Sequence, residues 1–243
     1  MIKTTGKGQI SLGGISYQLE ERFKSKKNSV YRASYLEEDS MGQDLLVIKK
    51  YLQPYDNIKN EIELLLDLKE KGLTVPRIYH KGSNYIVMEH IEGCLLLNKI
   101  EEREKRSSNT YRTNKDLIKK LLGWLEEFYQ LGEGRIIRDI NLRNFILTND
   151  GVLYGIDFED VSLGEIGEDI GKLCAFILTY YPALTWWKLE FTRELFNLSL
   201  EQFSLDRDNL LRELDKQINK INKKRKKNYS LKSFKDILLA DAQ

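Results

Sequence analysis

The stretch over residues 137–158 decides the fold and reads IRDINLRNFILTNDGVLYGIDF. Within it, Asp139 is followed five residues later by Asn144, and a short apolar strand comes next. Asn149–Gly151 predict a tight turn, because Asn, Asp and Gly tolerate the left-handed conformations that hairpin turns need. A second apolar strand then leads to Asp157. The stretch therefore predicts a β-hairpin that fixes the separation of the polar residues at its two ends.

The polar residues of this hairpin have the chemistry that phosphoryl transfer requires. One carboxylate must accept or orient the proton of the attacking hydroxyl, and Asp139 suits that role. An asparagine and a second carboxylate, here Asn144 and Asp157, are the ligands that hold Mg²⁺ on the phosphates of ATP. This order resembles the catalytic loop and metal-binding segment of the protein-kinase-like superfamily, on its aminoglycoside and choline phosphotransferase branch.

The resemblance covers residues 15–180 and implies an α+β, two-lobed protein-kinase-like fold. A small antiparallel-sheet lobe over residues 1–91 would bind the nucleotide. A mostly helical large lobe over residues 92–243 would carry the catalytic loop and bind the substrate. ATP and Mg²⁺ are the cofactors that it implies.

Three β-prone segments, separated by polar turns, predict an antiparallel meander in the small lobe. They span residues 16–23, 29–36 and 44–52, after a loose, glycine-containing lead-in over residues 1–14. The resemblance places the turn at 24–28 over the ATP phosphates. Residues 24–29 read Lys-Ser-Lys-Lys-Asn-Ser, without the glycines of protein kinases, so lysine and serine side chains, Ser29 among them, are the expected phosphate contacts. A solvated charged turn is the alternative.

Two adjacent lysines end the third predicted strand, and alternation along the strand does not choose between them. The Val-x-Lys pattern resembles that of the family and favours Lys49 over Lys50 as the residue that holds the α- and β-phosphates. On the helix predicted next, the resemblance implies that Glu61 pairs with Lys49 and positions it. Glu63 is the competitor and is expected to face solvent.

Residues 85–88 predict a buried strand, and the resemblance implies that the hinge between the lobes follows it. Met88 would be the gatekeeper beside the adenine. The carbonyl of Glu89 and the N–H of Ile91 would face the base. His90 has no role in such a mechanism and is expected to be structural, as is His80, which is expected in a loop.

The large lobe begins with a polar segment over residues 100–114, expected to be a mobile surface segment, and a helix with one apolar stripe over 115–131. The family usually has His where Ile137 stands, and an apolar side chain can fill that space. Asp169, twelve residues past Asp157, resembles an aspartate that braces the backbone of the catalytic loop. We expect structural support from it, not chemistry.

The amino-acid composition limits the class of protein and the partners that can be expected. The chain has 243 residues, 41% of them hydrophobic and 31% charged, with a formal net charge of +2, so net charge indicates neither a nucleic-acid nor a membrane partner. Cys94 and Cys174 are far apart and give no metal-binding spacing. No signal peptide and no apolar run of about 18 residues is recognised, which predicts a cytoplasmic protein without a membrane segment.

The acceptor is less well specified. Four acidic residues without an assigned role would suit an amine-bearing acceptor, with a solvated acidic loop as the alternative: Glu159, Asp160, Glu165 and Glu168. An aromatic group is expected to pack in the core more than to wall a substrate pocket: Tyr180, Tyr181, Trp186 and Trp187. The basic run Lys216–Lys227 predicts a solvated helix end, and contact with nucleic acid is the alternative.

Three functions remain open at this point. The first is ATP- and Mg²⁺-dependent phosphoryl transfer to a hydroxyl of a small molecule, as in the aminoglycoside phosphotransferases. The second is an atypical protein serine/threonine kinase, of the RIO type or the type found in the tRNA-threonylcarbamoyl complex, with a protein acceptor. The third is a non-catalytic, nucleotide-binding pseudokinase, which Ile137 and the glycine-free phosphate turn motivate.

Overall fold

The computed structural model describes residues 8–25, 27–36, 45–52, 56–106 and 114–240, so the turn predicted over residues 37–43 lies outside the described residues. The chain is α+β and divides into two compact units. The N-terminal unit consists of Met1–Glu92 and Ile156–Glu159, and the C-terminal unit of Gly93–Gly155 and Asp160–Gln243. The sequence did not predict that Ile156–Glu159 belong to the N-terminal unit.

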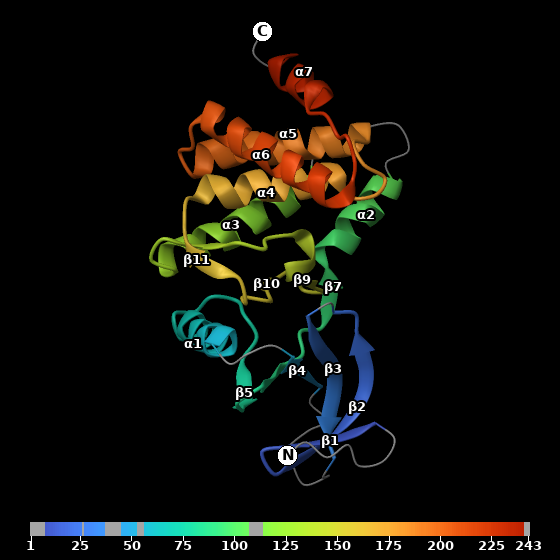
Figure 1. Ribbon diagram of the computed structural model, residues 1–243, viewed down its shortest axis with the longest axis vertical. Helices are drawn as coiled ribbons and strands as arrows, with labels where there is room; N and C mark the ends of the chain where they lie inside the picture. Colours follow the sequence, from blue (N-terminus) through green and yellow to red (C-terminus); the bar gives the residue numbers. More distant parts are fainter. Residues whose placement is uncertain (1–7, 26, 37–44, 53–55, 107–113, 241–243) are drawn as a thin grey trace. The chain divides into compact units, whose positions relative to one another are not determined.

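The N-terminal unit contains a six-stranded antiparallel sheet in the order β1-β2-β3-β4-β6-β5 (Figure 1). Its strands are β1 (Gln9–Leu12), β2 (Ile15–Phe23), β3 (Asn28–Tyr35), β4 (Leu46–Tyr51), β5 (Ile78–Lys81) and β6 (Tyr85–Glu89). The predicted meander corresponds to β2, β3 and β4. Two predictions were wrong: part of the lead-in forms β1, and His80 lies in β5 instead of a loop.

The core of this sheet explains why β1 forms. Ile10 and Leu12 alternate along β1 and are buried against the face of the sheet that carries Leu46 and Ile48. The helix α1 (Asp56–Glu70) ends just before Gly72, whose φ of +94° is the left-handed conformation that closes many helices.

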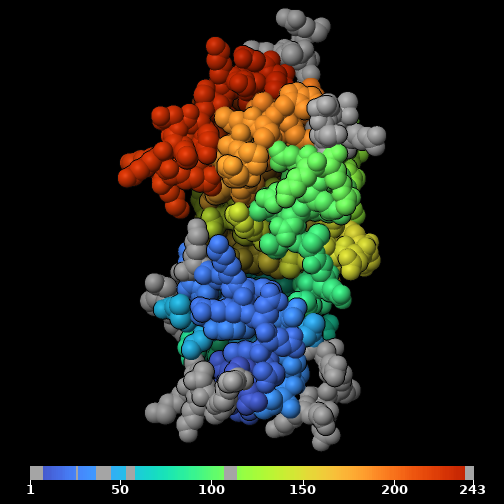
Figure 2. Space-filling model, turned by 90° about the vertical axis from the view of Figure 1, so that its right-hand side faces the viewer, coloured from blue at the N-terminus to red at the C-terminus, as the bar shows by residue number. Residues whose placement is uncertain are grey.

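The C-terminal unit is mostly helical. Its elements are β7 (Gly93–Leu95), α2 (Leu96–Arg106), α3 (Lys115–Leu131), β8 (Arg135–Ile137), the 3₁₀ helix η1 (Leu142–Asn144), β9 (Phe145–Thr148), β10 (Leu153–Gly155), β11 (Val161–Leu163), α4 (Ile166–Thr179), α5 (Trp186–Gln202), α6 (Arg207–Arg225) and α7 (Lys232–Ala240). Helices α4, α5 and α6 lie in neighbouring layers (Figure 1). On the face in Figure 2, α5 (orange) lies between the C-terminal helices (red) and α2 (green).

Two antiparallel pairings position the stretch over residues 137–158. Strands β9 and β10 pair antiparallel, with Leu147 opposite Leu153, which confirms the hairpin expected from the sequence. Strand β8 pairs with β11. The apolar stripe of α3 is buried over the range predicted, residues 115–131, and Trp124 packs edge-on against Phe145 at the start of β9.

The polar segment predicted over residues 100–114 needs correction. Residues up to Arg106 belong to α2, because Leu96, Leu97 and Ile100 give this charged helix a buried face. The part over 107–113 lies outside the described residues. The aromatic group predicted near residue 180 is also split: Tyr180 and Trp187 are buried, whereas Tyr181 and Trp186 are exposed.

Candidate functional site

A buried lysine is the centre of the polar cluster in the N-terminal unit. The side chain of Lys49 is only 7% exposed, and its ammonium lies 2.9 Å from Glu61 Oε1, 2.8 Å from Asp157 Oδ1 and 2.7 Å from Glu159 Oε1. This confirms the pairing of Lys49 with Glu61. Lys50 lies on the opposite face of β4, since successive side chains of a strand alternate.

Glu61 is held from several sides. It is 2% exposed on the inner face of α1, and it accepts the hydroxyl proton of Tyr51 at 2.6 Å and the N–H of Phe158 at 3.3 Å. Tyr51 was not predicted, although it lies two residues past Lys49 and therefore on the same face of the strand. Glu63 is exposed, 3.7 Å from the Lys59 ammonium, as expected for a solvated charge.

The electrostatics of this cluster keep the lysine charged. Burial would lower the pKa of Lys49, but Glu61, Asp157 and Glu159 together raise it above its ordinary value. Burial raises the pKa of Glu61, and the Lys49 ammonium counters part of that effect. Three carboxylates therefore surround a single ammonium, which leaves an excess of negative charge at a largely buried place.

Asp157 differs from its neighbours in backbone and exposure. Its φ of +68° is in the left-handed region, which Asp tolerates better than most residues but which still costs conformational energy. Its side chain is 51% exposed, and one of its oxygens accepts from the Lys49 ammonium. A strained, half-exposed carboxylate beside a buried cation is an arrangement typical of functional sites.

The cluster also fits a divalent cation. The carboxylate oxygens of Glu61, Asp157 and Glu159 lie within 4.8 Å of one another. Carboxylate oxygens are the donors that Mg²⁺ prefers, and an exposed Asp157 gives the ion access. Of the two predicted metal ligands, Asp157 belongs to this group, whereas Asn144 belongs to the C-terminal unit and is described below.

The register of β3 corrects the expectation for the phosphate turn. Ser29 is paired with Lys50, so its side chain lies on the face away from Lys49. Asn28 is paired with Tyr51 and therefore shares the face of Lys49, where its buried amide donates a hydrogen bond to the Glu159 carboxylate. The side chain next to Lys49 is thus Asn28 and not Ser29.

The expected hinge residues lie at the end of β6. Glu89 is the last residue of the strand; its N–H donates to the carbonyl of Arg77 at 2.8 Å, and its carboxylate accepts the N–H of Arg77 at 3.0 Å. Met88 is partly buried and Ile91 is buried. Burial lowers the pKa of His90, in keeping with a structural role. Adenine binding at Glu89 and Ile91 stays a prediction.

In the C-terminal unit, the loop of Asp139 is organised by two asparagines. The carbonyl of Asp139 accepts from Asn141 Nδ2 at 2.9 Å and from Asn144 Nδ2 at 3.1 Å. Asn141 Nδ2 also lies 3.1 Å from Asn144 Oδ1, and Asn141 caps η1 by accepting the N–H of Arg143. The Asp139 carboxylate itself is 59% exposed. The loop backbone is therefore fixed while its carboxylate faces solvent.

Asp169 braces this loop as predicted. It is buried on α4, and its Oδ2 accepts the N–H of Ile137 at 2.6 Å and the hydroxyl proton of Tyr129 at 3.1 Å. Burial raises the pKa of Asp169 to about 7, although both hydrogen bonds act to lower it. Ile137 is buried too, so its apolar side chain fills the space expected for it.

Lys172 is a contact of this loop that the sequence analysis missed. It follows Asp169 by three residues and therefore lies on the same side of α4. Its ammonium donates to the carbonyl of Arg138 and lies 3.5 Å from Asp139 Oδ1. The position one helical turn after Asp169 was the signal that could have identified it.

Two of the four acidic residues expected to attract an amine, Glu159 and Glu168, have partners within the chain. Glu159 contacts Lys49, and Glu168 pairs with Arg138 at 2.5 Å and accepts the N–H of Glu165 at 3.3 Å, at the start of α4. These carboxylates are accounted for by structure, so they give no support to a cationic acceptor.

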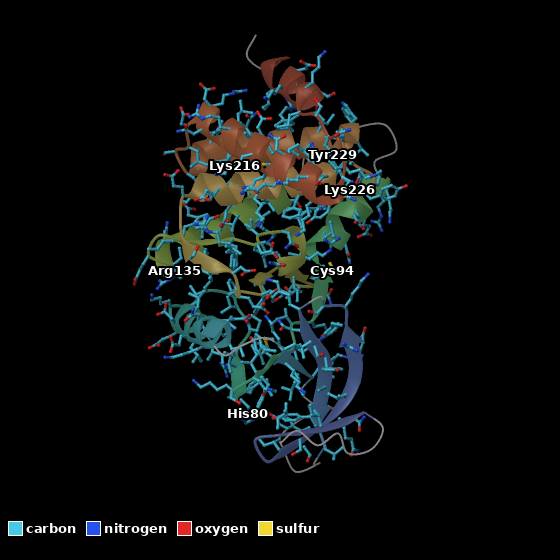
Figure 3. The ribbon with its side chains drawn as sticks, viewed as in Figure 1. His80, Cys94, Arg135, Lys216, Lys226 and Tyr229 are labelled. Atoms are coloured by element: carbon cyan, nitrogen blue, oxygen red, sulfur yellow. The ribbon has the colours of Figure 1, made fainter. Side chains whose placement is uncertain are left out.

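The basic run lies along the second half of α6 and just beyond it. Figure 3 marks Lys216 on α6 and Lys226 at its end, where Lys226 adopts a left-handed φ of 53°. Lys216 pairs with Glu213 at 3.1 Å. Basic residues in the last turn of a helix complement its dipole, so no partner is needed to explain them.

A comparison with models of known protein families finds no match for this chain, and a comparison with curated protein sequences finds none either. Among the described residues, no helix combines the length and the apolar character that crossing a membrane requires.

Proposed function

We propose that this chain is an ATP- and Mg²⁺-dependent phosphotransferase with a protein-kinase-like fold, and that its acceptor is a hydroxyl group of a small molecule. The observation that carries the proposal is the Lys49 ammonium, buried and fixed between Glu61 and Asp157. A buried cation held in place by carboxylates suits the recognition of phosphates, since the position of the ammonium is fixed before an anion arrives.

In the N-terminal unit, Lys49 would bind the α- and β-phosphates, and Glu61 and Tyr51 would keep its ammonium in place. Asp157 would be a Mg²⁺ ligand in this unit, and Asn144, in the C-terminal unit, is the other ligand that the resemblance implies. Bound Mg²⁺ would supply charge neutralisation on the phosphate oxygens. The backbone carbonyl of Glu89 and the N–H of Ile91 would bind adenine.

Asp139 would act on the acceptor. Its exposed carboxylate would orient the hydroxyl and take its proton as the hydroxyl oxygen bonds to the γ-phosphorus and the bond to the β-phosphate oxygen breaks, which releases ADP. The hydrogen bonds of Asn141 and Asn144 to the Asp139 carbonyl support this role, because they fix the loop before the substrate binds.

A small-molecule acceptor is proposed because two spacings resemble the aminoglycoside branch: the segment Gly72–Pro76, and the twelve residues from Asp157 to Asp169. The carboxylates of Glu159 and Glu168 add nothing to this choice, because they contact Lys49 and Arg138 of the chain. The proposal therefore specifies a hydroxyl and leaves the rest of the acceptor to experiment.

The test is transfer of label from γ-labelled ATP with Mg²⁺ into cell extract, separated beforehand into low-mass and high-mass fractions. Asp139→Ala is the inactive variant, and Asp150→Ala, an exposed turn residue of the same hairpin, is the matched control. Asp139-dependent label in a small molecule supports the proposal. Label in protein would favour an atypical protein kinase. ATP binding without Asp139-dependent label in either fraction would favour a non-catalytic nucleotide-binding protein.

A further inference from the structure

We propose that Lys49 and Asn28 form an oxyanion site for a phosphate of the bound nucleotide, and that the Glu159 carboxylate occupies this site until the nucleotide displaces it. The inference rests on the proposed function, and all three residues belong to the N-terminal unit. It assigns a phosphate contact to Asn28 and a gating role to Glu159.

One oxygen of Glu159 contacts both the Lys49 ammonium and the Asn28 amide. Its Oε1 lies 2.7 Å from the Lys49 ammonium, and the same atom accepts a hydrogen bond from the side-chain amide of Asn28. An ammonium and an amide converging on one anionic oxygen is the arrangement that a phosphate oxygen requires. The carboxylate therefore marks the place of such an oxygen.

The Lys49 ammonium is surrounded by anionic oxygens while this contact persists. Its three donors form hydrogen bonds with both carboxylate oxygens of Glu61 and with Asp157 Oδ1, and Glu159 Oε1 lies 2.7 Å away as a fourth anionic oxygen. A phosphate oxygen can take a place beside the ammonium only if one of these carboxylates moves away.

Glu159 is the carboxylate that can move away from the ammonium. Glu61 is buried and is also held by Tyr51 and Phe158, so releasing it would leave several polar groups without partners. Asp157 is the proposed metal ligand and would stay beside the phosphates. Glu159 is 14% exposed, and its further contact, Asn28, would bind the incoming phosphate oxygen in its place.

Asn28 also explains how a phosphate turn can work without glycine. Glycines allow backbone N–H groups to approach phosphates closely. Here the buried Asn28 amide supplies a donor from the first residue of β3, on the face that carries Lys49. The position of this side chain is fixed by the register of the strand and not by a flexible turn.

The experiment measures dissociation constants for ATP in EDTA, for ATP with Mg²⁺ and for adenosine, with thermal melting to verify folding. Glu159→Gln removes the competing charge at nearly constant size, Glu159→Ala removes the whole carboxylate, and Glu63→Gln is the control with the same charge change on the exposed side of α1. In EDTA, Glu159→Gln and Glu159→Ala should bind ATP about tenfold more tightly than wild type. Adenosine affinity should not change, because adenosine has no phosphate.

A second substitution tests Asn28 directly. Adding Asn28→Ala to Glu159→Gln should weaken ATP binding about fivefold relative to Glu159→Gln alone, because the amide donor to the phosphate is lost. An unchanged affinity would overturn the assignment of Asn28.

The experiment distinguishes a failure of the gate, meaning the displacement of Glu159 by a phosphate oxygen, from a failure of the proposed function. If wild type binds ATP but both Glu159 variants bind it no more tightly than Glu63→Gln, the gate is wrong and the function stands. If the Glu159 variants lose affinity only with Mg²⁺, Glu159 is a metal ligand and the gate is again wrong. If wild type and all folded variants fail to bind ATP, the proposed function falls and the inference falls with it.

Discussion

Around Lys49, in the N-terminal unit, the charged groups themselves are largely buried and bond to one another. Around Asp139, in the C-terminal unit, the carboxylate is exposed, and the loop is held by hydrogen bonds to its backbone carbonyl. Under the proposed function, stability and activity would depend on the same side chains around Lys49 and on different ones around Asp139.

The difference fits what the proposed function would require of each cluster. A cation that binds phosphates through direct contacts gains strength from burial, and burial requires carboxylates to offset the loss of hydration. A carboxylate that takes a proton from an incoming acceptor must be reachable from solvent. Substitutions at Lys49 should therefore change stability strongly, whereas substitutions at Asp139 should change activity with little effect on stability.

The largest change in unfolding free energy is expected for Lys49→Met. It removes the ammonium that contacts three carboxylates, and breaking a buried ion pair from one side costs about 3 to 5 kcal/mol of unfolding free energy. Urea denaturation of the purified variant measures this loss, and ATP binding should be lost with it.

The neighbouring lysine is the matched control for that measurement. Lys50→Met makes the same chemical change on the opposite face of β4 and should cost less than about 1 kcal/mol. Equal losses of stability in the two variants would contradict the central role of the Lys49 cluster.

The next effect is on activity alone. Asp139→Asn keeps the size of the side chain but removes its capacity to take a proton, so the rate of phosphoryl transfer should fall about a hundred- to ten-thousandfold. Since the Asp139 carboxylate is mostly exposed, the unfolding free energy should change by less than about 0.5 kcal/mol. Steady-state kinetics and denaturation together test this separation. A variant that keeps the wild-type rate would remove Asp139 from the proposed reaction.

Short patterns in the sequence predicted much of the structure around Lys49 and Asp139. The hairpin of β9 and β10 follows from apolar runs on either side of an Asn-Asp-Gly turn. The pairing of Lys49 with Glu61 and the support of the Asp139 loop backbone by Asp169 were expected from the family resemblance, although Ile137 was not named as the group that Asp169 contacts. In each case the signal lies in a short pattern or in an ordered set of motifs.

Other features depend on register and packing, which local patterns do not specify. The choice between Asn28 and Ser29 turns on a single residue of register at the start of β3, since a shift by one residue reverses the face. Strand β1 is short and lies within the glycine-containing segment 1–14, and its burial is decided by the neighbouring strand β2. Helix α2 carries mostly charged residues, so only its packing shows which side is buried.

A smaller effect, on pH dependence, is expected from Asp169. Its pKa is about 7 in the folded chain and about 3.8 when ordinary solvation is restored by unfolding. Between these values the folded state keeps a proton that the unfolded state has lost, so stability falls as pH rises, by at most about 1.4 kcal/mol per pH unit.

Asp169→Asn does not titrate and provides the comparison. Urea denaturation at pH 5, 6, 7 and 8 should show the unfolding free energy of wild type falling relative to that of the variant up to about pH 7, with no further divergence above it. A constant difference across this range would mean that Asp169 is already ionised throughout it.

The smallest effect is expected at Lys172, and it tests whether the catalytic loop needs support from a side-chain charge in addition to its backbone hydrogen bonds. The Lys172 ammonium contacts the Arg138 carbonyl and lies 3.5 Å from Asp139, in a partly exposed place, where such contacts contribute about 0.2 to 1 kcal/mol. Lys172→Met should therefore lower the rate of phosphoryl transfer by no more than about fivefold. Lys172→Arg, which keeps the charge, should restore the rate, and Lys216→Met on α6 should leave it unchanged. A loss that Lys172→Arg does not restore would assign Lys172 to packing instead of positioning.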